Sequence, residues 1–153
     1  MKDKKSLLVQ VMDWIGFLLL AGVNLFLGIG WGKFPQEIAG HYNLAGEIDR
    51  MAEKSSLLIY LLIIWICFIL LTAAERFPRL LGGKKVMSEE NTGRILKRIQ
   101  GMVSLARLLA VGILSYAVVC SAVVRPLGAW FLPGIMIFTF LAVIGFVILI
   151  FTA

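Results

Sequence analysis

The feature of this sequence that most constrains the fold is a set of four long apolar windows. They run from about Trp14 to Trp31, Leu57 to Ala74, Ser104 to Val124 and Phe131 to Phe151, and none has a charged residue near its middle. A transmembrane helix needs about 20 mostly apolar residues to cross roughly 30 Å of hydrocarbon. Because lipid offers no partners to backbone groups, such segments must be helical. We therefore predict four transmembrane helices.

The composition supports a membrane protein and excludes several other classes. Hydrophobic residues make up 60% of the chain and charged residues 16%, whereas soluble domains have about 45–50% and about 25%. This excludes a soluble enzyme, a disordered tail and a disulfide-stapled secreted module. We expect one all-α integral membrane domain over residues 1–153, a four-transmembrane-helix bundle. The expected helices are 12–32, 50–75, 88–124 and 131–152, with an ordered extracytoplasmic loop at 34–56.

The distribution of charge predicts the orientation of the chain in the membrane. The N-terminal tail and the segment between the second and third windows carry a net charge of +6, and the opposite side carries none. The positive-inside rule then places both termini and the second loop in the cytoplasm. We expect a multi-pass protein of a bacterial plasma membrane.

A basic segment precedes the third window and predicts contact with lipid. Ser88 can cap a helix on which Arg94, Lys97 and Arg98 share one face, opposite a face of apolar residues. An amphipathic helix of this kind lies on the anionic inner leaflet of the bilayer. A docking site for a cytoplasmic partner is the alternative. Nucleic acid is not expected as a partner, since the chain has neither a basic groove nor a reading motif.

The outer loop at 34–56 carries the only candidate site. It contains His41, which is the single histidine, and all four of the outer carboxylates. Asn43 to Gly46 has the residues of a type I turn, with Asn first and Gly fourth. Asp49 is placed to cap a helix that starts at Arg50 and continues into the second span.

The loop resembles a known family in its residues and their spacing. Phe34-Pro35, His41-Tyr42-Asn43, Gly46-Glu47, Asp49 and Lys54 are similar to the pattern of the domain of unknown function 1648, which lies between two membrane helices. Gln36 and Ala39 depart from that pattern. The same domain occurs in the Sdp immunity protein family of bacteria. The resemblance therefore implies a membrane protein that protects a producing cell from a membrane-active toxin, with signalling to a repressor.

Three roles for the loop remain open from the sequence. In the first, the motif binds an external peptide, toxin or lipid-linked ligand, and the protein is an immunity- or sensor-like factor. In the second, His41, Glu47 and Asp49 hold a metal in a small membrane-embedded enzyme. In the third, the motif only orders the loop. The motif residues are Pro35, His41, Tyr42, Asn43, Gly46, Glu47, Asp49 and Lys54.

Other chemistry is not expected. No catalytic residue, resident metal or cofactor is predicted, because the chain lacks a metal-binding spacing such as H-E-x-x-H and the serines are remote from His41. The polar residues predicted inside the spans, among them Asn24, are uncharged. An ion-coupled transporter usually has ionisable groups there, so this function is not expected. Small residues at four-residue spacing, such as Gly28 and Gly32, permit close helix packing within the bundle or in a homodimer.

Overall fold

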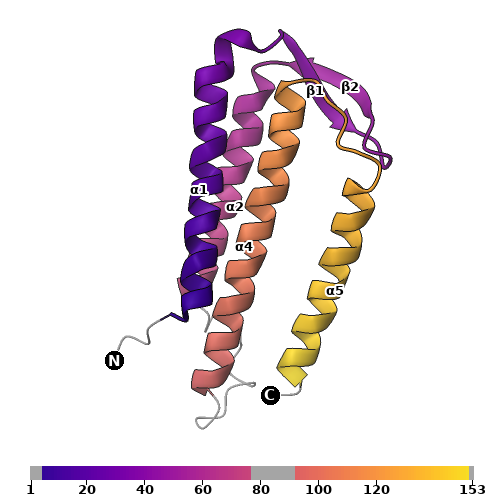
Figure 1. Ribbon diagram of the computed structural model, residues 1–153. Helices are drawn as coiled ribbons and strands as arrows, with labels where there is room; N and C mark the ends of the chain where they lie inside the picture. Colours follow the sequence, from indigo (N-terminus) through magenta and orange to yellow (C-terminus); the bar gives the residue numbers. More distant parts are fainter. Residues whose placement is uncertain (1–4, 77–91, 152–153) are drawn as a thin grey trace.

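In the computed structural model the long helices lie side by side, with the last of them apart from the others, and a β-hairpin lies at one end (Figure 1). The structure describes residues 5–76 and 92–151. The element order is α1 (Leu7–Gly30), the 3₁₀ helix η1 (Trp31–Lys33), β1 (Glu37–Tyr42), β2 (Ile48–Glu53), α2 (Ser56–Arg76), α4 (Thr92–Ala122) and α5 (Phe131–Phe151).

The bounds of α1 and α4 differ in part from the predicted ones. α1 begins earlier than predicted, at Leu7, because the Ser6 hydroxyl caps it by accepting a bond from the Val9 N–H at 3.3 Å. The basic segment is continuous with the third apolar window in α4. The predicted cap at Ser88 lies outside the described residues.

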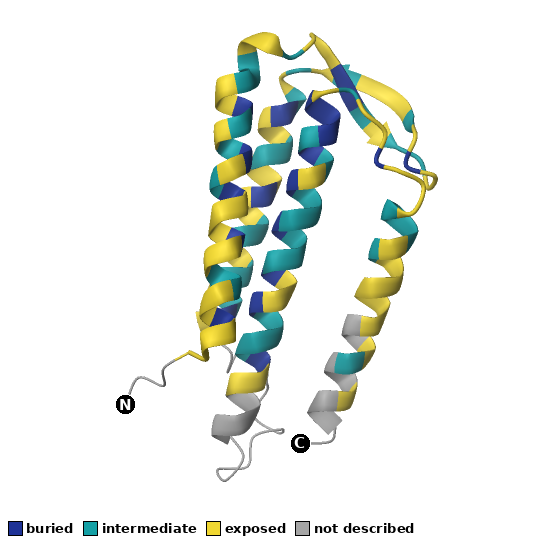
Figure 2. Cartoon of the chain, in the orientation of Figure 1, coloured by how far each residue is buried: buried dark blue, intermediate teal, exposed yellow. Residues whose placement is uncertain are grey.

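α4 is the central helix of the bundle. It packs extensively against both α1 and α2, which touch each other far less. The fully buried core side chains lie where these three helices and β1 meet: Leu20, Val23, Leu27, Ile38, Leu57, Ile64, Val111, Val118 and Ala122. The outward surfaces of α1 and α2 are largely exposed along their length (Figure 2).

This exposed surface is apolar, as expected of helices that face lipid. Within the described residues, α1 with η1, α2 and α4 are each long and apolar enough to cross a membrane. Only 11% of the apolar window of α2 is buried inside the protein. Exposure of this apolar surface to water would be unfavourable, whereas lipid is an apolar solvent that suits it. The chain is therefore a helical membrane protein. α5 has 21 residues, and its searched apolar stretch, Phe131–Leu141, is shorter than a full span.

The structure corrects two predictions about the outer loop. The protein is not all-α, since β1 and β2 pair as an antiparallel hairpin. The second long helix begins at Ser56 and not at Arg50, because residues 48–53 are paired as a strand and cannot also be helical. Asp49 therefore caps no helix. The turn at Asn43 to Gly46 was predicted correctly as a turn, with the Gly46 N–H bonded to the Asn43 carbonyl at 2.9 Å, and it joins two strands.

The tip of the hairpin is fixed to the segment between α4 and α5. The Leu127 N–H donates to the Gly46 carbonyl at 2.8 Å. Gly46 has a φ of +79°, and a Cβ there would lie 2.6 Å from the Gly128 carbonyl oxygen. Only glycine satisfies both conditions, because a side chain is strained at this φ and has no room at this contact.

We predict that Gly46→Ala loosens the hairpin tip more than Gly128→Ala does. Gly128 also has a positive φ, of +88°, but open space surrounds its Cβ position. Gly128→Ala should therefore cost only backbone strain, about 1 kcal/mol. Gly46→Ala adds a steric clash with backbone, a further ~2 kcal/mol. Thermal unfolding of both variants in detergent measures the difference, and equal losses would contradict the docking contact.

Candidate functional site

Two polar clusters lie at opposite ends of the bundle. One is the outer hairpin, which carries the predicted motif. The other is a set of charged side chains at the far end of α1, α2 and α4, which was not predicted as a site.

His41 and Asp49 form the exposed polar contact of the hairpin. The two residues lie on neighbouring strands, and His41 Nδ1 is 2.7 Å from Asp49 Oδ1. Their side chains are 56% and 43% exposed. Because both can also reach solvent, this pair is available to an external ligand.

Asn43 and Glu47 shape the turn of the hairpin. The Asn43 Oδ1 accepts bonds from the Ala45 N–H at 2.9 Å and the Glu47 N–H at 3.0 Å, and Asn43 Nδ2 donates to Glu47 Oε2 at 3.2 Å. This is the local bonding by which Asn favours turns. Glu47 is therefore directed to the turn and does not join His41 and Asp49. In the described part of the chain, no three His, Cys, Asp or Glu side chains are placed to hold a metal ion together.

Tyr42 attaches β1 to the end of α4. Its hydroxyl donates to the Arg125 carbonyl at 3.0 Å. Burial, with smaller contributions from neighbouring Cys120, Tyr116 and Tyr60, raises the pKa of Tyr42 to about 12. The phenol therefore keeps the proton that it donates.

Two further hydroxyls hold β1 against the helices. Tyr60 of α2 donates to the Gly40 carbonyl at 3.1 Å, and Ser121 of α4 donates to the Ala39 carbonyl. An apolar cavity of about 180 Å³ lies between β1, α2 and α4 beneath these contacts. Both strand carbonyls are satisfied by side chains, so the hairpin has a fixed position on the bundle.

Lys54 and Pro35 lie at the base of the hairpin. The Lys54 ammonium donates to the Trp31 carbonyl at 3.3 Å and lies 5.4 Å from the centre of the Trp31 ring. Pro35 is exposed in the short connection between η1 and β1. Lys54 therefore connects the base of the hairpin to η1.

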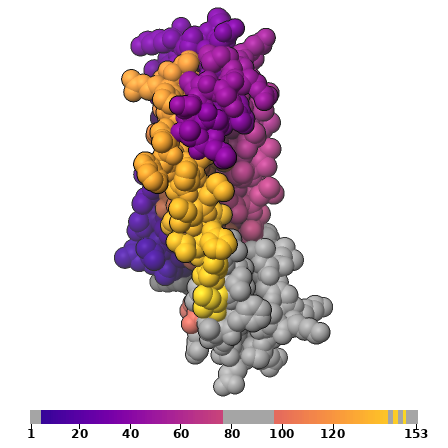
Figure 3. Space-filling model, turned by 90° about the vertical axis from the view of Figure 1, so that its right-hand side faces the viewer, coloured from indigo at the N-terminus to yellow at the C-terminus, as the bar shows by residue number. Residues whose placement is uncertain are grey.

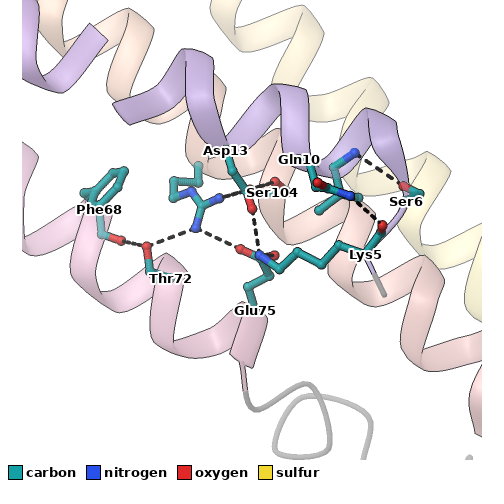
Figure 4. Close-up of polar contacts among 10 residues, drawn as sticks. Lys5, Ser6, Gln10, Asp13, Phe68, Thr72, Glu75 and Ser104 are labelled. Carbon is teal, nitrogen blue, oxygen red and sulfur yellow. Dashed lines mark hydrogen bonds and ion pairs between the residues drawn. The ribbon is translucent and has the colours of Figure 1, made fainter. Parts of the chain in front are cut away.

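The second cluster surrounds Arg107 of α4 (Figure 4). Its guanidinium donates to Thr72 Oγ1 at 3.0 Å and to Glu75 Oε2 at 2.8 Å, both on α2. On the other side it contacts Asp13 of α1. Ser104 of α4 completes the cluster by donating to Asp13 Oδ1 at 2.6 Å. One arginine thus joins all three packed helices.

Burial makes this cluster energetically important. The side chain of Arg107 is 4% exposed and that of Glu75 is 1% exposed. A charge removed from water is costly unless a partner and further hydrogen bonds compensate it. Two carboxylates and two cations give the cluster no net charge, because Lys5 also reaches Asp13 at 2.6 Å and contacts Glu75.

Lys5 closes the cluster from the N-terminal side. Its side chain is 38% exposed, and Gln10 holds this segment by donating to the Lys5 carbonyl at 2.9 Å. Partial burial alone would lower the pKa of Lys5, but hydrogen bonds to Asp13 and Glu75 and their negative charges together raise it. Lys5 therefore stays cationic and balances the second carboxylate.

This cluster was not predicted, because the charged residues of the N-terminal tail and of the segment between the second and third windows were considered only for their net charge. A signal was nevertheless present. Arg107 lies within the window that begins at Ser104, and Asp13 and Glu75 directly border two other windows. Ionisable residues at the edges of three spans have reason to pair with one another when they face the bundle interior.

The basic residues before the third span are partly described. Lys97 and Arg98 are exposed on α4, and the adjacent Ile99 is buried. Arg94 lies in α4, but its side chain is outside the described residues. The exposed and buried faces agree with the predicted amphipathic pattern, and contact with lipid stays a prediction.

The fold and the two clusters define a helical membrane protein with a β-hairpin fixed on one end. Residues 18–67 match the family model described as "Domain of unknown function (DUF1648)". The predicted resemblance is confirmed for this part of the chain, which runs from α1 through the hairpin into α2. No curated protein and no solved structure matches the chain.

We predict that removal of the Arg107 charge unfolds the bundle more readily than removal of the Lys5 charge. Arg107→Leu leaves the buried Glu75 without its guanidinium partner and the cluster with one excess negative charge, which should cost about 3–5 kcal/mol. Lys5→Ala is the matched control, and loss of this partly exposed charge should cost about 0–1 kcal/mol. Unfolding in detergent measures both.

A double variant tests the origin of this cost. Arg107→Leu with Glu75→Leu removes both the arginine and its buried partner. It should be more stable than Arg107→Leu alone, because no uncompensated Glu75 charge remains. A double variant less stable than Arg107→Leu would contradict the assignment.

Proposed function

We propose that this protein is a ligand-binding protein of the bacterial plasma membrane, immunity- or sensor-like, which uses its outer hairpin as the binding surface. In this proposal four helices span the membrane and both termini are cytoplasmic. The observation that carries it is the hairpin itself, which is fixed to the helices by buried contacts while its polar His41–Asp49 pair is exposed.

The fixed position of the hairpin favours binding. A surface already held in one conformation loses little conformational entropy when a ligand docks on it. Tyr42, Tyr60 and Ser121 provide this fixation on the inner side of β1. Their hydroxyls donate hydrogen bonds to backbone carbonyls, so the ligand is contacted by the outward residues His41 and Asp49.

The alternative role as a metal-dependent enzyme has less support from the geometry. That role required His41, Glu47 and Asp49 as a set. The His41–Asp49 contact is present, but Glu47 is bonded to Asn43 in the turn. A binding role needs only the exposed pair.

We predict the topology that this function requires. In a background without Cys67 and Cys120, Ala45→Cys and Ala129→Cys should react with a membrane-impermeant maleimide on intact cells. Arg98→Cys and a cysteine in a C-terminal tag should react only after permeabilisation. All three substituted residues are exposed. Labelling of the tag on intact cells would contradict a fourth span.

We predict that the exposed pair is required for protection by an immunity-like protein. A bacterial host that expresses the chain should tolerate a higher concentration of at least one peptide in a panel of membrane-active peptides. His41→Ala and Asp49→Ala should abolish this tolerance while membrane insertion is retained. Leu44→Ala is the control, since Leu44 is exposed at the turn and lies outside the motif. Unchanged tolerance in both variants would show that the motif is structural.

A further inference from the structure

We propose that the hairpin binds an extended cationic peptide by strand addition, with the outer edge of β2 pairing to the backbone of the peptide. This inference rests on the proposed function and gives it a binding mode. Three features of the hairpin support this binding mode: the phase of its hydrogen bonds, the groups that occupy each of its two edges, and its charge.

The phase of the ladder is set at the base of the hairpin. The Lys54 N–H donates to the Gln36 carbonyl at 2.8 Å. In an antiparallel ladder, hydrogen-bonded pairs alternate with pairs whose backbone groups point outward. Ala52, opposite Ile38 in the register, therefore bonds toward β1. Its two neighbours along the strand direct their N–H and C=O groups away from β1.

These neighbours are Met51 and Glu53, and both are exposed. The same phase makes the Ala39 carbonyl of β1 point outward, and this carbonyl accepts the Ser121 hydroxyl. The observed contact at Ala39 therefore supports the phase assigned to β2. Within residues 5–76 and 92–151, no backbone hydrogen bond joins Met51 or Glu53 to a segment outside the hairpin.

The two edges of the hairpin thus differ. The β1 edge faces the bundle, where hydroxyls from α2 and α4 occupy its carbonyls. β2 lies beyond β1 and forms the outer margin of the hairpin (Figure 1), and the hairpin occupies one end of the molecule (Figure 3). An edge with unpaired N–H and C=O groups is a template for another strand.

The charge of the hairpin indicates which peptide fits. Between residues 37 and 53 the carboxylates are Glu37, Glu47, Asp49 and Glu53, all exposed, against the single permanent cation Arg50. With His41 neutral, the hairpin has a net charge of −3. Asp49 and Glu53 lie on either side of Met51, which is 42% exposed. A strand that alternates cationic and apolar side chains complements this edge.

The test uses the full chain in lipid nanodiscs and a synthetic peptide of about eight residues with alternating Lys and Val, long enough to cover β2. A second peptide has the same sequence with an N-methyl group on every amide, so it keeps the charge but has no N–H left on either edge to complete the ladder. The first peptide should slow amide exchange at Met51 and Glu53 by about tenfold or more. The second should bind about tenfold more weakly, the equivalent of one or two hydrogen bonds.

A matched pair of variants isolates the edge. Met51→Pro removes one outward N–H, which proline permits at a sheet edge, and it should weaken binding of the first peptide about fivefold or more. Met51→Thr keeps the N–H and should bind within about twofold of the unsubstituted chain. Continued protection of the Ala52 amide shows that the hairpin of Met51→Pro is intact.

The outcomes separate this inference from the proposed function. Equal binding of both peptides would show attraction by charge alone, and no binding of either would also overturn strand addition. Protection of amides elsewhere, with none at Met51 or Glu53, would do the same. If His41→Ala and Asp49→Ala abolish tolerance in cells while the two peptides bind equally, the proposed function stands and strand addition fails.

Discussion

The bundle depends on the interaction of one arginine with carboxylates from two other helices. α1 and α2 have little direct contact, and both pack on α4. At the end opposite the hairpin, Arg107 reaches Asp13 on one side and Glu75 on the other. Because Arg107 and Glu75 are buried and the cluster is neutral as a whole, each of these two charges depends on the other for compensation. The three apolar helices are thereby held in one arrangement, which nonspecific contacts between apolar surfaces would not select by themselves in lipid.

α4 connects the Arg107 cluster to the hairpin at the other end of the protein. Ser121 lies at its outer end and Arg125 shortly after it, and both provide contacts for β1. The position of the hairpin therefore follows from the position of α4. The helix reaches its outer end with Val124 in a left-handed conformation at φ 53°, and the chain then turns toward the contact between Leu127 and Gly46. The polar surface of the hairpin is thus a part of the fold and not a loose connection between two spans.

Much of this architecture could be predicted from the sequence, and the errors have physical causes. Long apolar windows predicted four transmembrane helices, because lipid leaves the backbone no other choice. Within the described residues, α1 with η1, α2 and α4 are long and apolar enough to cross a membrane. The turn at Asn43 to Gly46 was recognisable from its residue types. The strands on either side were missed, because Asp49 suits a helix cap as well as a strand and the hairpin is stabilised by Tyr60 and Ser121, which are distant in sequence.

The Arg107 cluster shows a second limit of sequence analysis. Asp13, Glu75 and Arg107 are distributed over the chain, and the prediction used only the net charge of the segments that contain them. Only the packing of α1 and α2 on α4 brings them together. In the outer motif, His41 and Asp49 lie in contact, whereas Glu47 is separated from them by the direction of its side chain in the turn.

The central claim is that the hairpin is held in one position on the helices before any ligand binds. Hydrogen–deuterium exchange of the full chain in lipid nanodiscs, without ligand, tests this claim most directly. The amides of Ala52 and Lys54 point toward Ile38 and Gln36 on the other side of the hairpin. They should exchange as slowly as the amides at the outer end of α4. Exchange of these two amides at the rate of an unstructured peptide would contradict the account.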